Sequence, residues 1–351
     1  MFNQLFSALR RLSPGVALIA ATSAFLLFSD TTERGPSKMP RVAIFQFSSV
    51  VLLDDGVKGV LDSLREHGYV AGRNIQIDRF NAQDDMPTAV SIGKEITSGR
   101  YDYVITVSTN CLQAVANANH AGRARHIFGV VADPVAAKVG VNPNNPLDHP
   151  PYMVGIGSLM PASEVMELAR RFNPNIRRFG QPWNPSQANS LKFTQMAREA
   201  APKMGVEVID GAVDNTTMVA EVVASLVSRG ADAILALGDL TVAMAMDSVI
   251  AEARKGRIPV FSVMPESALR GALMGAGPDW GILGRHLGDL AVRVIQGEDT
   301  AKMPIIYAVP KQYAINLTAL DGLRGHWAAP PDLLAKANTI IDSTGVHQNK
   351  H

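Results

Sequence analysis

The chain has 351 residues, of which 47% are hydrophobic, and it carries 33 lysines and arginines against 32 aspartates and glutamates. This length fits two domains of ordinary size, and the apolar content is enough to fill two cores. The near-neutral and interspersed charge argues against a nucleic-acid-binding protein, and the single cysteine, Cys111, excludes an intrachain disulfide and a CxxC metal site.

The first forty residues differ in composition from the rest. Arg10 and Arg11 precede the apolar run 16–28, which has the length of the hydrophobic region of a secretory signal. The run is shorter than the roughly 18 to 20 residues that a membrane span needs. Residues 29–40 are polar, contain glycine and proline, and are typical of a linker. We therefore predict an exported protein in which residues 1–40 are a signal peptide or an uncleaved N-terminal anchor, followed by a linker.

From residue 41 the chain alternates between strand and helix patterns. Four apolar strands with helical patterns between them predict a parallel, doubly wound sheet. The predicted strands are 42–47, 74–80, 103–107 and 126–131, and the helices between them include 87–98 and 110–120.

A second series of the same kind follows the Pro- and Asn-rich loop 142–151. Its predicted strands are one that ends at Trp183, then 206–209, 233–237 and 259–263, and its predicted helices are 161–172, 186–204, 219–229 and 240–254. This repeat of architecture predicts a second lobe.

The C-terminal part is predicted to return to the first lobe and then to cross again to the second lobe. It contains a strand at 271–276, a helix at 279–296, strands at 305–309 and 313–317, and a helix at 331–341. We therefore predict an α/β fold of two doubly wound parallel-sheet lobes joined by a hinge. Lobe one comprises residues 41–157 and 271–300, and lobe two comprises residues 158–270 and 301–345.

Short polar residues recur where the predicted strands end and the next helices begin. In an open parallel sheet these turns share the carboxyl edge, where ligands bind. Two such edges that face each other would enclose a crevice. The candidate ligand-binding residues are Gln46, Phe47, Thr109, Asn110, Asp133, Asn184, Ser186, Asn189, Ser190, Asp239 and Thr241.

The turn 183–187 carries the most specific local signal. Asn184 is predicted to cap a helix whose first residue is Pro185, with Gln187 completing a capping box. The free N–H groups of this helix, with Ser186 and Asn189, would form a cradle for a carboxylate or phosphate. The alternative is a well-capped surface helix without a ligand.

Other candidates have structural alternatives too. Asp133 precedes a proline and is a good helix cap, and Asp239 is either a cap or an unpaired carboxylate that meets a ligand cation. Phe47 lies either in the core or on the wall of the crevice. The sequence contains no G-x-S-x-G, P-loop or H-E-x-x-H motif, so we predict a protein that is not an enzyme and needs no cofactor or metal.

Five motifs, taken in order, resemble the ABC-transporter substrate-binding proteins of the tryptophan/tyrosine-binding type. They are Gly68–Asn74, Val131–Val135, Asn184–Ser190, Gly238–Val242 and Leu283–Arg285. The resemblance implies the type I periplasmic-binding fold, a location in the periplasm or on the extracytoplasmic face of the inner membrane, and delivery of a small solute to an ABC permease. The family usually has glutamate at the position of Gln187, asparagine at that of Leu240, and a Thr-Pro pair where Thr109 and Asn110 stand.

The predicted ligand is a zwitterionic amino acid with an apolar or aromatic side chain. Its carboxylate would meet the helix N-terminus at Asn184 and Ser186, and its ammonium would meet Asp239, while Phe47 and Thr109 enclose the side chain. The alternative function is an exported or membrane-anchored ligand sensor with the same two-lobe architecture. An enzyme of the crevice is a third possibility.

Overall fold

The computed structural model describes residues 39–307 and 311–349. The predictions for residues 1–38, and for part of the strand 305–309, lie outside these ranges. Among the described residues, no helix has the length and apolar content that a membrane crossing requires.

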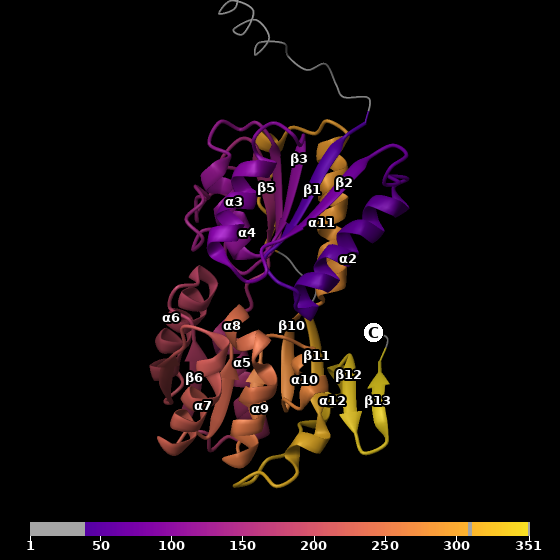
Figure 1. Ribbon diagram of the computed structural model, residues 1–351. Helices are drawn as coiled ribbons and strands as arrows, with labels where there is room; N and C mark the ends of the chain where they lie inside the picture. The colour runs from indigo at the N-terminus through magenta and orange to yellow at the C-terminus, as the bar shows by residue number, and fades with distance from the viewer. Residues whose placement is uncertain (1–38, 308–310, 350–351) are drawn as a thin grey trace, which may run out of the picture. The chain divides into compact units, whose positions relative to one another are not determined.

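The first lobe is built on a five-stranded parallel sheet with the order β2-β1-β3-β4-β5 (Figure 1). Its strands are β1 (Arg41–Gln46), β2 (Gln76–Asn81), β3 (Tyr103–Val107), β4 (Arg125–Val131) and β5 (Met153–Gly157). Its helices are α2 (Val51–Glu66), α3 (Met86–Ile96), α4 (Thr109–Ala118), α11 (Trp280–Ile295) and the 3₁₀ turn η2 (Thr300–Lys302). Because α2 and α11 pack on one face and α3 and α4 lie on the other, the sheet is doubly wound, as predicted.

The second lobe is built on an eight-stranded sheet with the order β13-β12-β11-β10-β9-β8-β6-β7. Its strands are β6 (Arg178–Trp183), β7 (Glu207–Ala212), β8 (Ala233–Ala236), β9 (Val260–Ser262), β10 (Met274–Pro278), β11 (Lys311–Asn316), β12 (Thr339–Asp342) and β13 (Gly345–Gln348). The five strands β6 to β10 are parallel, whereas β11 runs antiparallel to β10 and β13 runs antiparallel to β12. The two-lobe α/β fold is confirmed, with a mixed rather than purely parallel second sheet.

Helices cover both faces of the second sheet. They are α5 (Ala162–Phe172), α6 (Ala188–Lys203), α7 (Val219–Ser228), α8 (Leu240–Met244), α9 (Met246–Lys255), α10 (Ser267–Arg270) and α12 (Pro331–Lys336), with 3₁₀ turns η1 (Thr216–Met218) and η3 (Leu317–Leu320). Helices α5 and α6 contact each other, and α7 contacts α9. The helix predicted for 240–254 is broken at Ala245 into α8 and α9.

The described chain passes between the two sheets three times. It leaves β5 for α5, and it leaves β10 for α11, which packs on α2 and β4. The third passage lies between Ile306, which pairs with Ile156 beside the first sheet, and β11 in the second sheet. Three connections of this kind allow the lobes to rotate about a hinge.

Two of the predicted lobe boundaries are wrong. The strand at the start of 271–300 is β10, which pairs with β9 and β11 in the second sheet, so only the helix after it packs in lobe one. Residues 300–306, predicted for lobe two from 301 onward, contact β5 instead. An apolar strand pattern does not encode which sheet edge the strand joins, because either edge would bury it equally well.

The predicted helix 331–341 is also too long. Helix α12 ends at Lys336, and residues 339–342 form β12. Asn338 explains the change, because its side chain accepts a hydrogen bond from the N–H of Tyr313 at 3.0 Å and its own N–H donates to the carbonyl of Tyr313 at 2.8 Å. Because of these two hydrogen bonds, the chain pairs with β11 of the sheet and the helix does not continue.

Helix α11 belongs to lobe one because its backbone touches that of α2. A Cβ atom added at Gly284 would lie 2.2 Å from the carbonyl oxygen of Gly56, and one at Gly59 would lie 2.3 Å from that of Gly281. Glycine is therefore required where the helices cross, since any side chain would force the two backbones apart.

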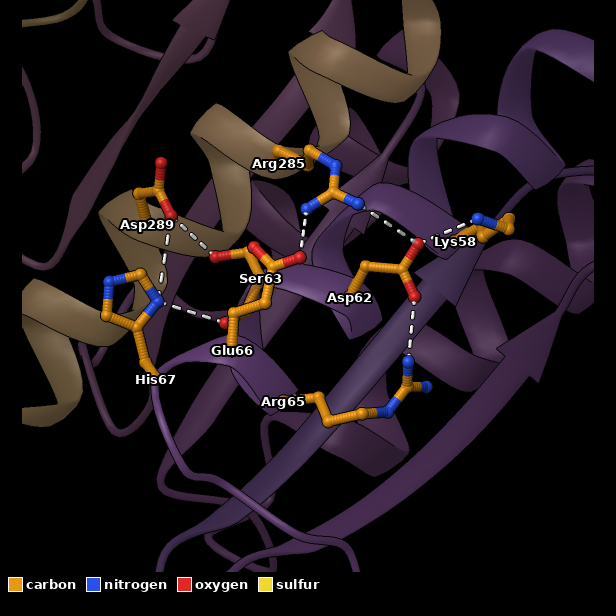
Figure 2. A network of polar contacts seen from close by, with 8 residues as sticks. All are labelled: Lys58, Asp62, Ser63, Arg65, Glu66, His67, Arg285 and Asp289. Atoms are coloured by element: carbon orange, nitrogen blue, oxygen red, sulfur yellow. Dashed lines mark hydrogen bonds and ion pairs between the residues drawn. The ribbon is translucent and has the colours of Figure 1, made fainter.

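Polar contacts flank this crossing (Figure 2). Ser63 donates to Asp289 at 2.6 Å, and Arg285 donates to Glu66 at 2.5 Å and lies 3.7 Å from Asp62. The arginine pairs are solvent-exposed and contribute little, whereas Ser63 is buried. The close helix contact is thus the main reason that α11 stays with α2.

Replacing Gly284 with alanine should therefore destabilise the protein by about 2 kcal/mol or more, because the contact atom is backbone and cannot move aside. Gly281→Ala is the matched control on the same helix, since its Cβ would meet only Asp279 Oδ1 at 3.4 Å. That control should change stability by less than about 1 kcal/mol. Urea unfolding measures both, and equal midpoints for the two variants would contradict the close packing.

Candidate functional site

Three of the predicted site residues line a cavity between the lobes. The cavity encloses about 540 Å³ of empty space, counting the part that is open to solvent. Its lining consists of Leu52, Leu53, Ser108, Thr109, Val130, Ala132, Asn189, Phe193, Gly238, Asp239, Leu240, Val263, Met264, Pro278 and Trp280. Most of these side chains are apolar, as is typical of small-molecule sites.

The lobe-one wall is formed where β3 and β4 end. Ser108 and Val130 both have positive backbone φ angles, 135° and 53°, and the register between β4 and β5 shifts between Phe128 and Val131. Positive φ is costly for a β-branched residue such as valine, and strain of this kind is concentrated at ligand sites. The strained turns bring both residues to the cavity.

The same wall carries the N-terminus of α4, a ten-residue helix. The Ser108 hydroxyl caps it by accepting a hydrogen bond from the N–H of Cys111 at 3.2 Å, and Thr109 is the first helical residue. Both side chains line the cavity and are almost fully buried. A helix N-terminus has partial positive charge and free N–H groups, so this wall favours an anionic group.

The lobe-two wall contains Asn189 and Phe193, which are four residues apart on α6 and share one face of the helix. The Asn189 amide donates to the carbonyl of Gly238, and its Oδ1 has no hydrogen-bond partner among the described residues. Because Asn189 is only 8% exposed, this oxygen is a buried acceptor at the cavity. The Phe193 ring lies against Gly238, where an added Cβ would be 1.9 Å from it.

Asp239 ties this wall together. One carboxylate oxygen accepts from the N–H of Asn184 and the hydroxyl of Ser190, both at 2.5 Å, and the other accepts from the N–H of Val242 at 2.9 Å. Asp239 caps α8, which confirms the first of its two predicted alternatives, and its carboxylate is not unpaired. Burial raises the pKa of this carboxyl above its usual value, and the hydrogen bonds from Ser190 and the backbone act in the opposite direction.

The turn at Asn184 does not have the predicted role. Helix α6 begins at Ala188, and Gln187 precedes it without a side-chain cap. The side-chain oxygen of Asn184 instead accepts from the backbone and hydroxyl of Ser186 at 2.9 and 2.6 Å. The amides of Asn184 and Gln187 both donate to the Thr241 hydroxyl, at 3.0 and 2.8 Å. These side chains satisfy one another and brace the start of α8, so the turn is absent from the cavity lining.

Four other predicted residues lie outside the cavity lining. Gln46 donates to Asp54 at 2.8 Å, Phe47 lies in the core of lobe one, and Asn110 is buried in α4. Asp133 accepts from the N–H groups of two residues that follow it and forms an ion pair with Lys192 of α6 at 3.3 Å. Thr109, Asn189 and Asp239 are the predicted residues that line the cavity.

The sequence predictions missed the aromatic side chains of the site. Phe193 could have been found, since it lies one helical turn after Asn189. Trp280 follows the cap residue Asp279 at the passage between the lobes, and its indole N–H donates to Glu266 at 3.2 Å. No local pattern marks Trp280, because its place in the cavity depends on the path of the chain between the sheets.

The electrostatic environment of the cavity is negative on the lobe-two side. Partial burial and the nearby charge of Asp239 raise the pKa of Asp84, which lies in lobe one. The charge of Asp239 thus disfavours the ionised form of Asp84, which comes from the opposite lobe. Among the described residues, no group of three or more His, Cys, Asp or Glu side chains could hold a metal ion.

Comparisons with known proteins identify relatives of this chain. The chain is 28% identical over 286 residues to the tyrosine-binding protein of Clostridioides difficile, covering 82% of this chain and 81% of that protein. A domain from Streptococcus pneumonia in complex with L-Trp is 25% identical, has a TM-score of 0.79, and covers 86% of this chain and 100% of that one. The ligand-free, open structure of a substrate-binding protein from Clostridium difficile is 28% identical, has a TM-score of 0.64, and covers 84% and 97% of the two chains.

The family model described as "ABC transporter substrate binding protein" matches residues 41–339, which include both lobes and every residue of the cavity. The chain therefore belongs to the ABC transporter substrate-binding protein family.

Proposed function

We propose that this protein captures an aromatic L-amino acid, tryptophan or tyrosine, in the cavity between its lobes and delivers it to an ABC permease. The observation that carries the proposal is an apolar, partly aromatic cavity in which a helix N-terminus and a buried free acceptor stand on opposite walls. An amino acid zwitterion needs this pair of groups. The relatives that bind tyrosine and L-Trp support the same ligand class.

The carboxylate of the ligand would lie at the start of α4. The hydroxyls of Ser108 and Thr109 and the first N–H groups of the helix supply donors, and the helix dipole favours the negative charge. This assignment replaces the turn at Asn184, whose groups are occupied by neighbouring side chains.

The ammonium would lie on the lobe-two wall. The free Oδ1 of Asn189 accepts one of its hydrogen bonds, and Asp239 contributes negative charge from a carboxylate that three protein groups already hold. Asp84 adds to this field from the other lobe. The ammonium would thus be met by an acceptor and a net negative potential, as charge-assisted binding requires.

The side chain of the ligand would be enclosed by the apolar lining. Phe193 and Trp280 provide aromatic surfaces, and Leu52, Val130 and Met264 fill the remaining wall. An indole or phenol ring would gain most of its binding energy from this burial, while the polar groups fix its orientation.

The structure supports a closed arrangement of the lobes. The cavity is lined from both lobes, and Lys192 of lobe two forms its ion pair with Asp133 of lobe one. The TM-score is higher against the L-Trp complex, at 0.79, than against the ligand-free, open relative, at 0.64. A protein that closes on its ligand presents a different surface to a permease when it is loaded, and family membership supports a location outside the cytoplasm for this step.

Each head group of the ligand can be tested by omission. L-Tryptophan should bind, whereas tryptamine, which lacks the carboxylate, and indole-3-propionate, which lacks the ammonium, should each bind about 30-fold to several thousand-fold more weakly. Isothermal titration calorimetry measures all three. If tryptamine or indole-3-propionate bound as tightly as tryptophan, the corresponding head-group site would be wrong.

Asn189→Ala should weaken tryptophan binding by about 10- to 100-fold, because it removes the acceptor for the ammonium and leaves the Gly238 carbonyl without its donor. Gln195→Ala on the same helix is the control, since Gln195 is exposed and bonds only to Glu199 in the described hydrogen bonds. Equal affinities for the two variants in calorimetry would rule out Asn189 as a ligand contact.

Lys192→Met should weaken tryptophan binding by up to about fivefold at low salt, because a partly exposed ion pair between the lobes stabilises the closed form modestly. The loss should disappear at high ionic strength, where the wild-type pair is screened. Lys203→Met, at the exposed C-terminal end of the same helix, is the control and should have no effect. A wild-type affinity for Lys192→Met at both salt concentrations would show that the pair does not contribute to closure.

A further inference from the structure

A second cavity adjoins the ligand cavity at the mouth of the cleft. This outer groove encloses about 1070 Å³, counting the part open to solvent. It is lined by Ser49, Val50, Val51, Leu52, Asp54, Ala243, Met244, Met246, Met264, Glu266, Ser267, Leu269 and Arg270. The lining comes from α2 of lobe one and from α8 to α10 of lobe two, so the groove follows the line where the lobes meet.

Leu52 and Met264 line both the ligand cavity and the outer groove. They come from opposite lobes, and each is nearly buried, at 8% and 4% exposure. A third link lies beside them, because Trp280 lines the inner cavity and donates its hydrogen bond to Glu266, which lines the groove. The two spaces are therefore separated only by side chains. We term the two side chains that line both spaces, Leu52 and Met264, the partition.

The partition does not include the groups that would orient an amino acid. Ser108, Thr109 and Asn189 line the inner cavity, and none of them lines the groove. A ligand whose head group contacts these residues must direct its side chain toward the apolar remainder of the cavity, where Leu52, Met264 and Trp280 stand. The partition therefore faces the end of the ligand side chain.

The groove beyond the partition is suited to an apolar group. Val51, Met244 and Leu269 are 55%, 37% and 57% exposed, and all three line the groove. Three large exposed apolar side chains in one concave surface would gain energy from contact with a hydrocarbon or aromatic substituent. The barrier to such a substituent is steric rather than chemical.

We propose that Leu52 and Met264 set the upper limit on ligand length, so that the protein accepts a single aromatic ring system and rejects amino acids whose side chains extend into the groove. The inference rests on the proposed function, since it assumes an aromatic amino acid in the inner cavity. It assigns size selection to one side chain from each lobe, which come together where the lobes close.

Shortening either side chain should join the two spaces without disturbing the backbone. The N–H of Met264 donates to Ser262, and its carbonyl accepts from the hydroxyl of Ser267, so Met264→Ala keeps both of these bonds. Leu52 is the second residue of α2, and Leu52→Ala should keep the helix because alanine is a good helix former. Two variants on separate lobes protect the test against misfolding of one of them.

The test compares L-tyrosine with O-benzyl-L-tyrosine by calorimetry. The wild type should bind the benzyl ether at least about 100-fold more weakly than tyrosine, because a packed wall cannot move aside by the length of a ring. Leu52→Ala and Met264→Ala should each bring the two affinities to within about tenfold. Val263→Ala is the matched control, since Val263 lines only the inner cavity and its truncation adds space without opening the partition.

The outcomes separate the two proposals. Wild-type protein that binds both compounds equally would overturn the partition, as would variants that bind tyrosine but still exclude the benzyl ether. A gain of benzyl ether binding by Val263→Ala as large as that by Met264→Ala would also overturn it. If the wild type bound neither tyrosine nor tryptophan, the proposed function would fail and the partition with it.

Discussion

The buried carboxylate of Asp239 is the interaction on which the lobe-two half of the site depends. It accepts hydrogen bonds from the N–H of Asn184, which follows β6, from the hydroxyl of Ser190 on α6 and from the N–H of Val242 on α8. A carboxylate that is 1% exposed would be very costly without such donors. Because these segments converge on one charge, α6 is held with Asn189 and Phe193 directed at the cavity.

A second constraint is the backbone contact between α2 and α11. It assigns α11 to lobe one although the strand before it, β10, belongs to lobe two. The passage from Pro278 to Trp280 is consequently both a part of the hinge and a part of the cavity wall. A ligand that contacts Trp280 would therefore touch the segment that links the two lobes, which couples occupancy of the cavity to the hinge.

The two walls of the cavity have complementary chemistry. Lobe one offers the positive end of α4, while lobe two offers a free acceptor at Asn189 and the buried carboxyl of Asp239. In the proposed function a zwitterion would span both walls, and its two charges would stabilise the closed form, since either lobe alone would satisfy only one of them. The apolar lining between these groups and the partition beside Trp280 then select the side chain by shape.

The sequence by itself determined the α/β class, the two-lobe repeat and part of the lining of the cavity. These follow from local hydrophobic periodicity and from polar residues after strands, and they correctly brought Thr109, Asn189 and Asp239 to the cavity. Local patterns also suggested helix caps at Asn184 and Asp239. Such patterns do not identify the role, because the same polar residue can cap a helix, stabilise a turn or contact a ligand.

Only the tertiary structure decided which of these roles each polar side chain has. Asn184 and Gln187 bond to Thr241, more than fifty residues away, and this pairing removes their turn from the site. Leu52, Met264 and Trp280 are brought to one place by three passages of the chain between two sheets. Contacts between residues so distant in sequence depend on strand order and helix packing, and neither is encoded in the spacing of residues along a single segment.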